Sequence, residues 1–568
     1  MAGPVYSVGI DYGTESARAV LVDTATGRVV ATAVHAYRNG VIDVRLPAPD
    51  DDVILRPDWA LQDPGDYLAA LGDTIPRLLA ESGVDPASVI GLGIDFTACT
   101  MLPTTADGTP LCTVDRYRRQ PHAWVKLWKH HAAQPEADEV NALARSRGEP
   151  WLPRYGGKIS SEWFFPKALQ ILREAPDVYG AADRLIEAAD WVVWRLTGVE
   201  TRNSCTAGYK AIWSRSDGFP SDGYFAGLDP RLEHVVDAKM SRTILPIGAR
   251  AGGLSAEAAS WTGLRPGTAV AVANVDAHVS VPAAGVTEPG TMVAIMGTSI
   301  CHMVLGERMA EVAGMCGVVE DGIIPGLFGF EAGQSAVGDI FGWFVDNGVP
   351  PEYHERARQQ GVDVHQVLEA EAAMSRPGES GLLALDWWNG NRSVLVDVDL
   401  TGLLIGATLA TRASDIYRAL IEATAFGTRV IIEALEAGGV KVERLVACGG
   451  LPERNRLAMH IFADVTGLEV RLASSAQASA LGSAMFGAVA AGSAGGGHDS
   501  IIEAARWMAN SEGELVQPIA AHQPVYDTLY SEYIQLHDWF GRDGSEVMKR
   551  LKQLRASVSA NAHEPATV

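Results

Sequence analysis

A short hairpin pattern that occurs twice in this 568-residue chain constrains the fold more than any other feature. Near the N-terminus, an apolar stretch runs into Asp11, a Gly13-Thr14 turn follows, and apolar residues resume. Residues 292–304 repeat this design around Gly297-Thr298. Each copy predicts two antiparallel strands joined by a tight turn. We therefore expect two related large units and not a solenoid of short repeats.

The two turns suit a phosphate-bearing ligand. The glycine of each turn lets backbone N–H groups approach a ligand closely, and Thr14 and Thr298 add hydroxyl groups. Asp11 supplies a hard oxygen that can hold Mg²⁺, directly or through water. Taken alone, Asp-x-Gly-Thr is also an ordinary hairpin turn. Its occurrence in both halves favours a nucleoside triphosphate held between them.

Size, charge and cysteine pattern exclude several classes of protein. The net charge of -23 argues against a nucleic acid or an anionic membrane as partner, because either requires a basic face. The six cysteines are scattered without a C-x-x-C pair, so neither a zinc site nor a disulfide framework is predicted. No signal-peptide pattern opens the chain, and the apolar run 268–286 contains Asn274, Asp276 and His278. We expect a cytoplasmic protein with no membrane span.

The expected domain boundary lies at the Glu288-Pro289-Gly290 turn, because the second hairpin starts directly after it. A chain of this length is too long for one hydrophobic core, and residues 5–37 predict a three-strand meander. Further strand patterns and stretches of helical periodicity follow along the chain. We predict an N-terminal domain at 1–287, a C-terminal domain at 288–545 and a tail at 546–568.

Asp276 is the strongest candidate for a catalytic residue. It follows the predicted buried strand at 268–273 and starts a short helix. A carboxylate in that position can accept the proton of a substrate hydroxyl while its oxygen attacks a γ-phosphate. Without the two hairpins, the position would favour a helix N-cap, which is a common role for aspartate. His278 is interpreted as a packing residue, because no partner His or Cys stands at metal-ligand spacing.

Four further features allow both a functional and a structural interpretation. Lys210 can hold a polar substrate or be simply solvated, and Glu331 can accept sugar hydroxyls or belong to a buried ion pair. The glycines at 449–450, between a strand and a helix, can admit adenine or form an ordinary loop. The tryptophans at 124–163 can form a sugar-stacking wall or a core.

Several longer motifs, in this order, resemble the FGGY carbohydrate kinases, and within that family the chain is most similar to the ribulokinases. The resemblance runs from about Tyr6 to about Gly541. Two short family signatures are met only in part, around Lys158 and Trp163 and around residues 402–422, and we assign them no catalytic role. The motifs that carry the resemblance are Gly9-Ile10-Asp11-Tyr12-Gly13-Thr14-Glu15-Ser16, Asp95-Phe96-Thr97-Ala98-Cys99-Thr100, Asn274-Val275-Asp276-Ala277-His278, Phe330-Glu331-Ala332-Gly333-Gln334 and Leu385-Asp386-Trp387-Trp388-Asn389-Gly390-Asn391.

The resemblance implies an α/β fold of two actin-like, ribonuclease-H-like domains around a central cleft for nucleotide and sugar. It implies that Asp276 is the catalytic base and that Asp11 organises Mg²⁺. The residues implied to surround the ATP phosphates are Gly13, Thr14, Gly297 and Thr298; those facing adenosine are Gly449, Gly450 and Asn455; and those lining a ketopentose are Ala98, Lys210, Asp276 and Glu331.

The implied reaction converts L-ribulose and ATP to L-ribulose 5-phosphate and ADP, a step of arabinose catabolism. Related enzymes accept other ketopentoses and some pentitols, so a kinase for one of these is an alternative, and a homodimer is possible. Two other classes stay open: an actin-like switch ATPase, which needs no sugar site, and a catalytically silent sugar-binding regulator. The presence of both Asp11 and Asp276 disfavours the silent regulator.

Overall fold

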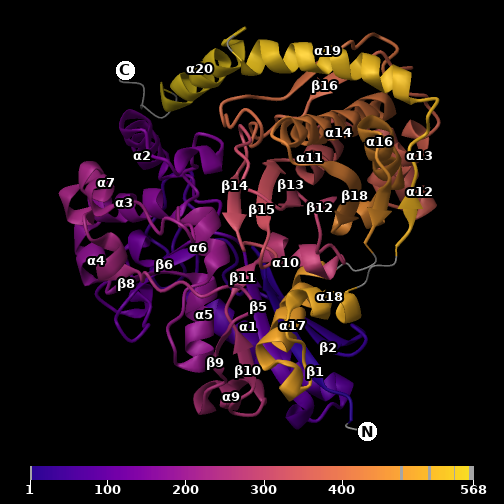
Figure 1. Ribbon diagram of the computed structural model, residues 1–568. Coiled ribbons are helices and arrows are strands. Elements are labelled where there is room, and N and C mark those ends of the chain that lie inside the picture. The colour runs from indigo at the N-terminus through magenta and orange to yellow at the C-terminus, as the bar shows by residue number, and fades with distance from the viewer. Residues whose placement is uncertain (1–2, 474–476, 510–512, 543, 562–568) are drawn as a thin grey trace.

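The computed structural model describes residues 3–473, 477–509, 513–542 and 544–561, and Figure 1 shows their arrangement. Two large mixed sheets form the framework. In the first sheet, β1, β2 and β3 make an antiparallel meander, while β5 and β10 continue it in parallel with β1. The predicted three-strand meander is thus confirmed. The strands are β1 (Tyr6–Tyr12), β2 (Ser16–Asp23), β3 (Val29–Ala36), β5 (Val89–Phe96), β9 (Arg250–Gly253), β10 (Ala269–Ala271) and β11 (Asn274–Val275).

The second sheet repeats this topology. β12 pairs antiparallel with β13, which pairs antiparallel with β15, and β18 and β19 continue in parallel with β12. The duplication predicted from the two hairpins is therefore present in the strand order. The strands are β12 (Gly290–Met296), β13 (Ile300–Gly306), β14 (Gly317–Glu320), β15 (Phe328–Gln334), β18 (Val442–Cys448), β19 (Val470–Leu472) and β20 (Leu515–Val516).

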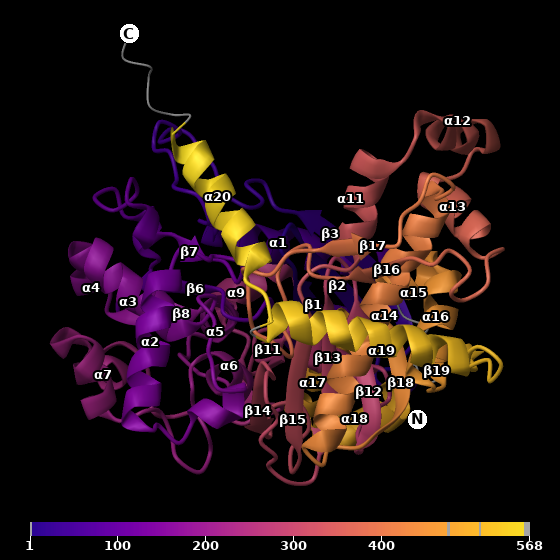
Figure 2. The same cartoon turned by 90° about the horizontal axis from the view of Figure 1, so that it is seen from above.

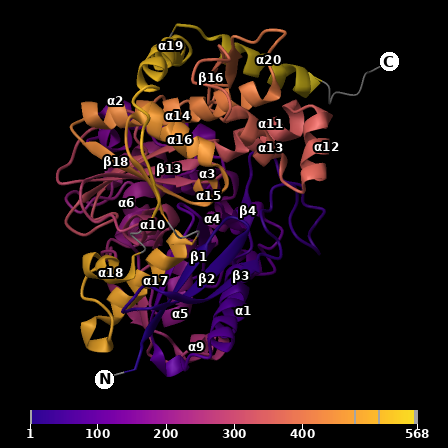
Figure 3. The same ribbon diagram turned by 90° about the vertical axis from the view of Figure 1, so that its right-hand side faces the viewer.

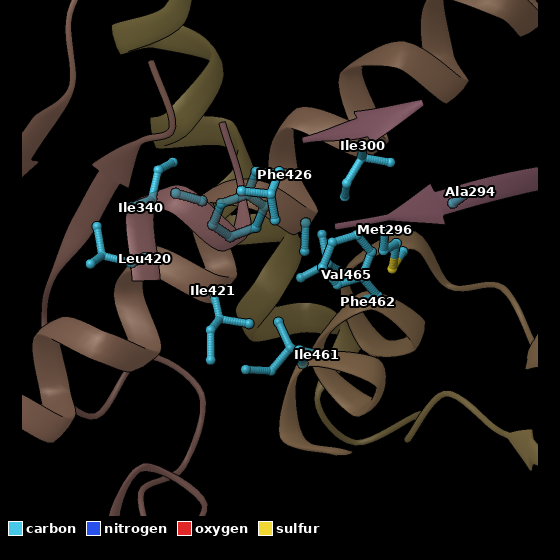
Figure 4. Close-up of a cluster of buried hydrophobic side chains, with 14 of the residues drawn as sticks. Ala294, Met296, Ile300, Ile340, Leu420, Ile421, Phe426, Ile461, Phe462 and Val465 are labelled. Atoms are coloured by element: carbon cyan, nitrogen blue, oxygen red, sulfur yellow. The ribbon is translucent and has the colours of Figure 1, made fainter. Parts of the chain in front are cut away.

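Helices on the second sheet enclose its hydrophobic core. The long helix α14 contributes Leu420 and Phe426, which pack with Met296 and Ile300 of the hairpin and with Phe462 (Figure 4). All five side chains are buried, so this packing fixes the position of the second turn. The helices of this half are α11 (Gly338–Gly348), α12 (Pro351–Gln360), α13 (Val364–Ala372), α14 (Ala413–Ala437), α15 (Gly450–Arg454), α16 (Arg456–Thr466) and α19 (Gln523–Gly541), with the short strands β16 (Leu383–Leu385) and β17 (Leu403–Ile405).

A second layer of structure extends the N-terminal half. A small sheet in the order β4-β7-β6-β8 packs with several helices, and Trp124, Trp151 and Trp163 are buried in its core. Of the two interpretations of the tryptophans, these three rings therefore fit the core. The elements are β4 (Leu61–Gln62), β6 (Met101–Thr104), β7 (Val125–Lys126), β8 (Arg184–Glu187), α1 (Pro64–Ser82), α2 (Gln134–Arg147), α3 (Phe164–Glu174), α4 (Pro176–Ala181), α5 (Ala188–Thr197), α6 (Ser204–Lys210), α7 (Asp222–Leu228), α8 (Val235–Lys239) and α9 (Ala256–Thr262).

Two helices connect the halves. α10 (Asp276–Ala283) packs against α17 (Ala478–Ala491), and α17, although late in the chain, lies on β1 and β5 (Figure 1). Glycines permit this contact: a Cβ atom on Gly93 would lie 1.9 Å from the Ser483 carbonyl oxygen. The backbones of α17 and β5 are therefore in direct contact. The boundary proposed at 287/288 remains a prediction, and α18 (Ile501–Met508) also packs on α17.

Gly93→Ala is expected to lower the free energy of unfolding by about 3 kcal/mol, the upper end of overpacking costs, because backbone atoms cannot move aside as a side chain can. Urea unfolding of the variant measures this. The matched control is Gly342→Ala in α11, where an added Cβ meets no atom within 4 Å and a gain of about 0.5–1 kcal/mol is expected. Equal stability of the two variants would contradict the direct contact.

The C-terminal stretch expected to be a tail is helical over its described part. α20 (Val547–Asn561) leaves the end of α19 at an angle (Figure 2), and both helices lie at the end of the molecule opposite the first sheet (Figure 3). Met548 is buried, and Lys549 and Lys552 form ion pairs with Asp397 and Asp399 at 3.0 Å. Within the described residues, no helix is long and apolar enough to cross a membrane.

Candidate active site

Three carboxylates meet at one edge of the first sheet. Asp11 near the end of β1 stands opposite Asp95 of the parallel strand β5, and Asn274 of β11 stands opposite Asp95 from the other side. Asp276 follows two residues later, as the first residue of α10. The carboxyl ends of parallel strands are the usual place for a ligand in open α/β sheets. The topology therefore brings both predicted acids, Asp11 and Asp276, to one site.

These carboxylates influence one another. Burial and the charge of Asp11 raise the pKa of Asp276 to about 7. Burial also raises the pKa of Asp11, although Arg18, 3.2 Å away, opposes this. Burial and the charge of Asp11 raise the pKa of Asp95 well above its usual range. The Ser483 hydroxyl of α17 donates to Asp95, at 2.6 Å.

The position of Asp276 suits a proton acceptor. The N-cap position of α10 is Val275, and the Ala277 N–H donates to Asp276 Oδ1 at 2.7 Å. The N-cap role considered from the sequence is thus taken by its neighbour. A carboxyl group whose pKa lies near the working pH can both accept and release a proton during turnover.

A buried ion pair joins the two halves beside this edge. Lys210 at the end of α6 donates to both carboxylate oxygens of Glu331 in β15, at 2.9 and 3.0 Å. His278 Nε2 lies 3.5 Å from Glu331 Oε2. Arg392 also donates to Glu331 Oε1, at 3.3 Å. The ion-pair interpretation of Glu331 is therefore correct, and Lys210 is not simply solvated.

Nearby cationic groups keep the Glu331 carboxylate ionised. Burial disfavours the Glu331 carboxylate, but Lys210, His278 and Arg392 outweigh burial and lower its pKa to about 2. Burial lowers the pKa of His278 to about 4, so its imidazole is neutral at pH 7. Sequence reasoning missed Arg392, although it directly follows the Trp387–Asn391 motif that carried part of the resemblance.

Ala98 lies in a short buried turn between β5 and β6. The hydroxyls of Thr97 and Thr100 are hydrogen-bonded at 2.9 Å, and Cys99 has a left-handed backbone with φ of 59°. Left-handed backbone is uncommon for residues other than glycine and costs roughly 1 kcal/mol or more. Surrounding contacts must therefore hold the turn in this conformation.

The predicted nucleotide residues occupy two turns and a helix start. Thr14 accepts a hydrogen bond from Trp128 Nε1 at 3.1 Å, and the carbonyls of Gly297 and Thr298 accept from the start of α11. A Cβ on Gly297 or Gly450 would meet no atom within 4 Å, so both leave open space for a ligand. Gly449 instead packs tightly, since its added Cβ would lie 2.5 Å from the Met296 carbonyl oxygen.

Asn455 is placed differently from the other nucleotide residues. Its side chain caps α16 by accepting from Ala458 N–H at 2.9 Å and donates to the Tyr417 hydroxyl at 3.1 Å. It is buried, and both polar groups of its side chain have partners within the protein. The position of Asn455 beside the glycines is therefore fixed by helix capping.

The donor set at the sheet edge fits a hard cation with few protein ligands. Asp11, Asp95 and Asp276 crowd negative charge, which a divalent cation would relieve. Across the described ranges, no group of three or more His, Cys, Asp or Glu residues has the arrangement of a dedicated metal site. Mg²⁺ is commonly held by one or two carboxylates, water and substrate phosphates, so these residues fit it.

Comparisons with known proteins identify what this chain resembles. Models of the N-terminal and C-terminal domains of the FGGY family of carbohydrate kinases match residues 6–281 and 292–491. The ribulokinase of Geobacillus thermodenitrificans is 59% identical over 98% of both chains. That of Mycolicibacterium smegmatis is 51% identical over 98% of this chain and 97% of its own.

Solved structures agree with the fold. The xylulose kinase of Lactobacillus acidophilus matches with a TM-score of 0.77 at 16% identity, covering 95% of this chain and 99% of its own. The xylulose kinase of Rhodospirillum rubrum matches with a TM-score of 0.75 at 24% identity, covering 94% and 98%. At these identities the likeness concerns the fold alone, and it confirms the prediction of two actin-like domains.

Proposed function

Because the chain belongs to the FGGY family of carbohydrate kinases, we propose that it phosphorylates L-ribulose with ATP, forming L-ribulose 5-phosphate and ADP. Relatives named ribulokinase, 59% identical over 98% of the chain, support this substrate. The observation that carries the chemistry is Asp276, whose pKa is about 7, at the same sheet edge as Asp11. The Lys210–Glu331 pair lies beside Asp276 and offers a donor and an acceptor for the hydroxyls of a sugar.

In this proposal Asp276 takes the proton from the terminal hydroxyl of the sugar. The hydroxyl oxygen forms a bond to the γ-phosphorus while the bond from phosphorus to the β-phosphate oxygen breaks, and ADP leaves. Lys210 donates to sugar oxygens and Glu331 accepts from sugar hydroxyls, which orients the chain of the sugar. Since the pair already exists without sugar, little reorganisation is required on binding.

The nucleotide is assigned to the two turns. The N–H groups of Gly13 and Gly297 close their turns by donating to the carbonyls of Ser16 and Ser299, so the Thr14 and Thr298 hydroxyls beside them would bind the phosphates. The open surface at Gly450 would admit adenosine. Asp11 would hold Mg²⁺, directly or through water. Bound there, Mg²⁺ supplies neutralisation of the phosphate charge during transfer.

A sugar-dependence assay tests this function. ADP release is measured by a coupled assay with ATP and Mg²⁺ across the four 2-ketopentoses and the pentitols. We expect turnover that requires sugar and is led by L-ribulose. Turnover led by another ketopentose or a pentitol would transfer the assignment to that substrate, and hydrolysis indifferent to sugar would favour the switch ATPase. The cytoplasmic location stays a prediction, and the homodimer stays a possibility that size measurements in solution would test.

A further inference from the structure

Lys167 is a fully buried lysine just behind the site. It lies in α3, and its ammonium donates to two backbone carbonyls, that of Cys99 at 2.7 Å and that of Leu127 at 2.8 Å. Within the described part of the chain, it forms no ion pair with a carboxylate at 4.0 Å or less. Its two hydrogen bonds therefore go to two separate loops.

The first of these loops carries the proposed sugar contact. Cys99 directly follows Ala98 and has the left-handed backbone described above. The Thr100 carbonyl accepts from Ala188 N–H at 2.6 Å, which fixes the far end of the turn. The Lys167 ammonium donates to the carbonyl of Cys99 itself, and bonds from an ammonium are stronger than neutral ones, so this bond helps to stabilise the left-handed conformation.

The second loop leads to the phosphate turn. Leu127 directly precedes Trp128, whose indole N–H donates to Thr14 Oγ1 at 3.1 Å. The Lys167 ammonium thus binds the residue next to Ala98 in one loop and the residue next to Trp128 in the other. In the described part of the chain, no second charged side chain donates to either carbonyl.

Burying an ammonium without an acidic partner is costly. Burial lowers the pKa of Lys167, partly offset by Cys99, Glu187 and Glu162. Removing an ion from water costs several kcal/mol, and an apolar side chain of similar length would avoid this cost. A charge kept in such a place points to a requirement for position, not for stability.

We propose that Lys167 is a positioning residue that sets the sugar turn at residues 97–100 and the phosphate turn at Thr14 in the correct relation for transfer. The proposal rests on the site assigned above to Ala98 and Thr14. Without the ammonium, the sugar hydroxyl and the γ-phosphate would be misaligned, and water would compete as acceptor.

The test compares Lys167→Met with Lys126→Met. Lys126 is a matched control: it is equally buried, in β7 of the small sheet, but its ammonium lies 4.3 Å from the centre of the Trp59 ring and 3.5 Å from His130 Nε2. For Lys167→Met we expect kcat/KM for the sugar to fall about 10²-fold, as misplacement by about 1 Å does. We also expect more ADP released per sugar phosphate formed. Lys126→Met should change neither quantity by more than about threefold.

Two results would overturn the proposal. One is equal kcat/KM and equal coupling ratios in the two variants. The other, decisive if Lys167→Met does not fold, is full coupling in Trp128→Phe, which keeps the ring but removes the N–H donor to Thr14. A wild-type protein that shows no sugar-dependent turnover would instead overturn the proposed function, so the two failures are distinguishable.

Discussion

Asp276→Asn is expected to lower kcat by about 10³-fold, within the range for loss of a general base. Asparagine keeps the size and the polarity of the side chain but cannot accept the hydroxyl proton. KM for sugar should change little, since the Lys210–Glu331 pair remains. Steady-state kinetics with ATP and L-ribulose measure both values.

The pH profile provides a second readout of the same residue. The base works only when ionised, so with a pKa of about 7 the wild-type kcat/KM should fall tenfold per pH unit below that value. This limb should be absent from Asp276→Asn. The control is Asp190→Asn: burial also raises the pKa of Asp190 to about 7, but it binds Asn203 at 2.8 Å, away from the site. An Asp276→Asn variant with more than a tenth of wild-type kcat would refute the assignment.

Lys210→Met is expected to reduce both activity and stability. It leaves the Glu331 carboxylate buried with a neutral His278 and the single contact from Arg392. Breaking a buried pair on one side costs about 3–5 kcal/mol. Loss of a charged donor to the sugar should lower kcat/KM about 10²-fold. Urea unfolding and sugar kinetics measure the two effects.

The double variant Lys210→Met with Glu331→Leu separates these effects. Removing both charges should restore part of the stability but not the activity, since the Glu331 carboxylate is no longer buried without Lys210 and only the partly exposed Arg392 loses its partner. Arg418→Met is the control: it breaks the buried Arg418–Glu422 pair, 2.8 Å apart in α14, and should lower stability without changing KM for sugar. Recovery of both stability and kcat/KM in the double variant would mean that the pair is only structural.

Much of the framework could be predicted from the sequence because it depends on neighbours along the chain. The hairpins at Asp11 and at Gly297 form between strands that are joined by a short turn, so alternation and turn residues suffice to predict them. The placement of Asp276 after a strand and at a helix start is equally local. These local signals, with the resemblance, led to the fold and to the proposed base.

The partners of the buried polar side chains at the site could not be predicted from local sequence signals. Glu331 was open between a sugar acceptor and an ion pair, because a carboxylate among apolar residues does not specify which cation reaches it. Lys210 is 121 positions earlier in the chain, and Arg392 is 61 positions later. Asn455 was assigned to adenosine by the family resemblance, whereas in the structure its side chain caps α16 and binds the Tyr417 hydroxyl.

The sequence by itself determined the two hairpins, their phosphate-type turns and the acids at the ends of their strands, because each depends on residues close together in the chain. Only the tertiary structure decided that α17 returns to the first sheet, that Lys210 meets Glu331 across the two halves, and that Lys167 reaches both loops. The physical reason is that these contacts join segments far apart in sequence. They form only when backbones approach at glycines such as Gly93 and when buried charges must find their partners.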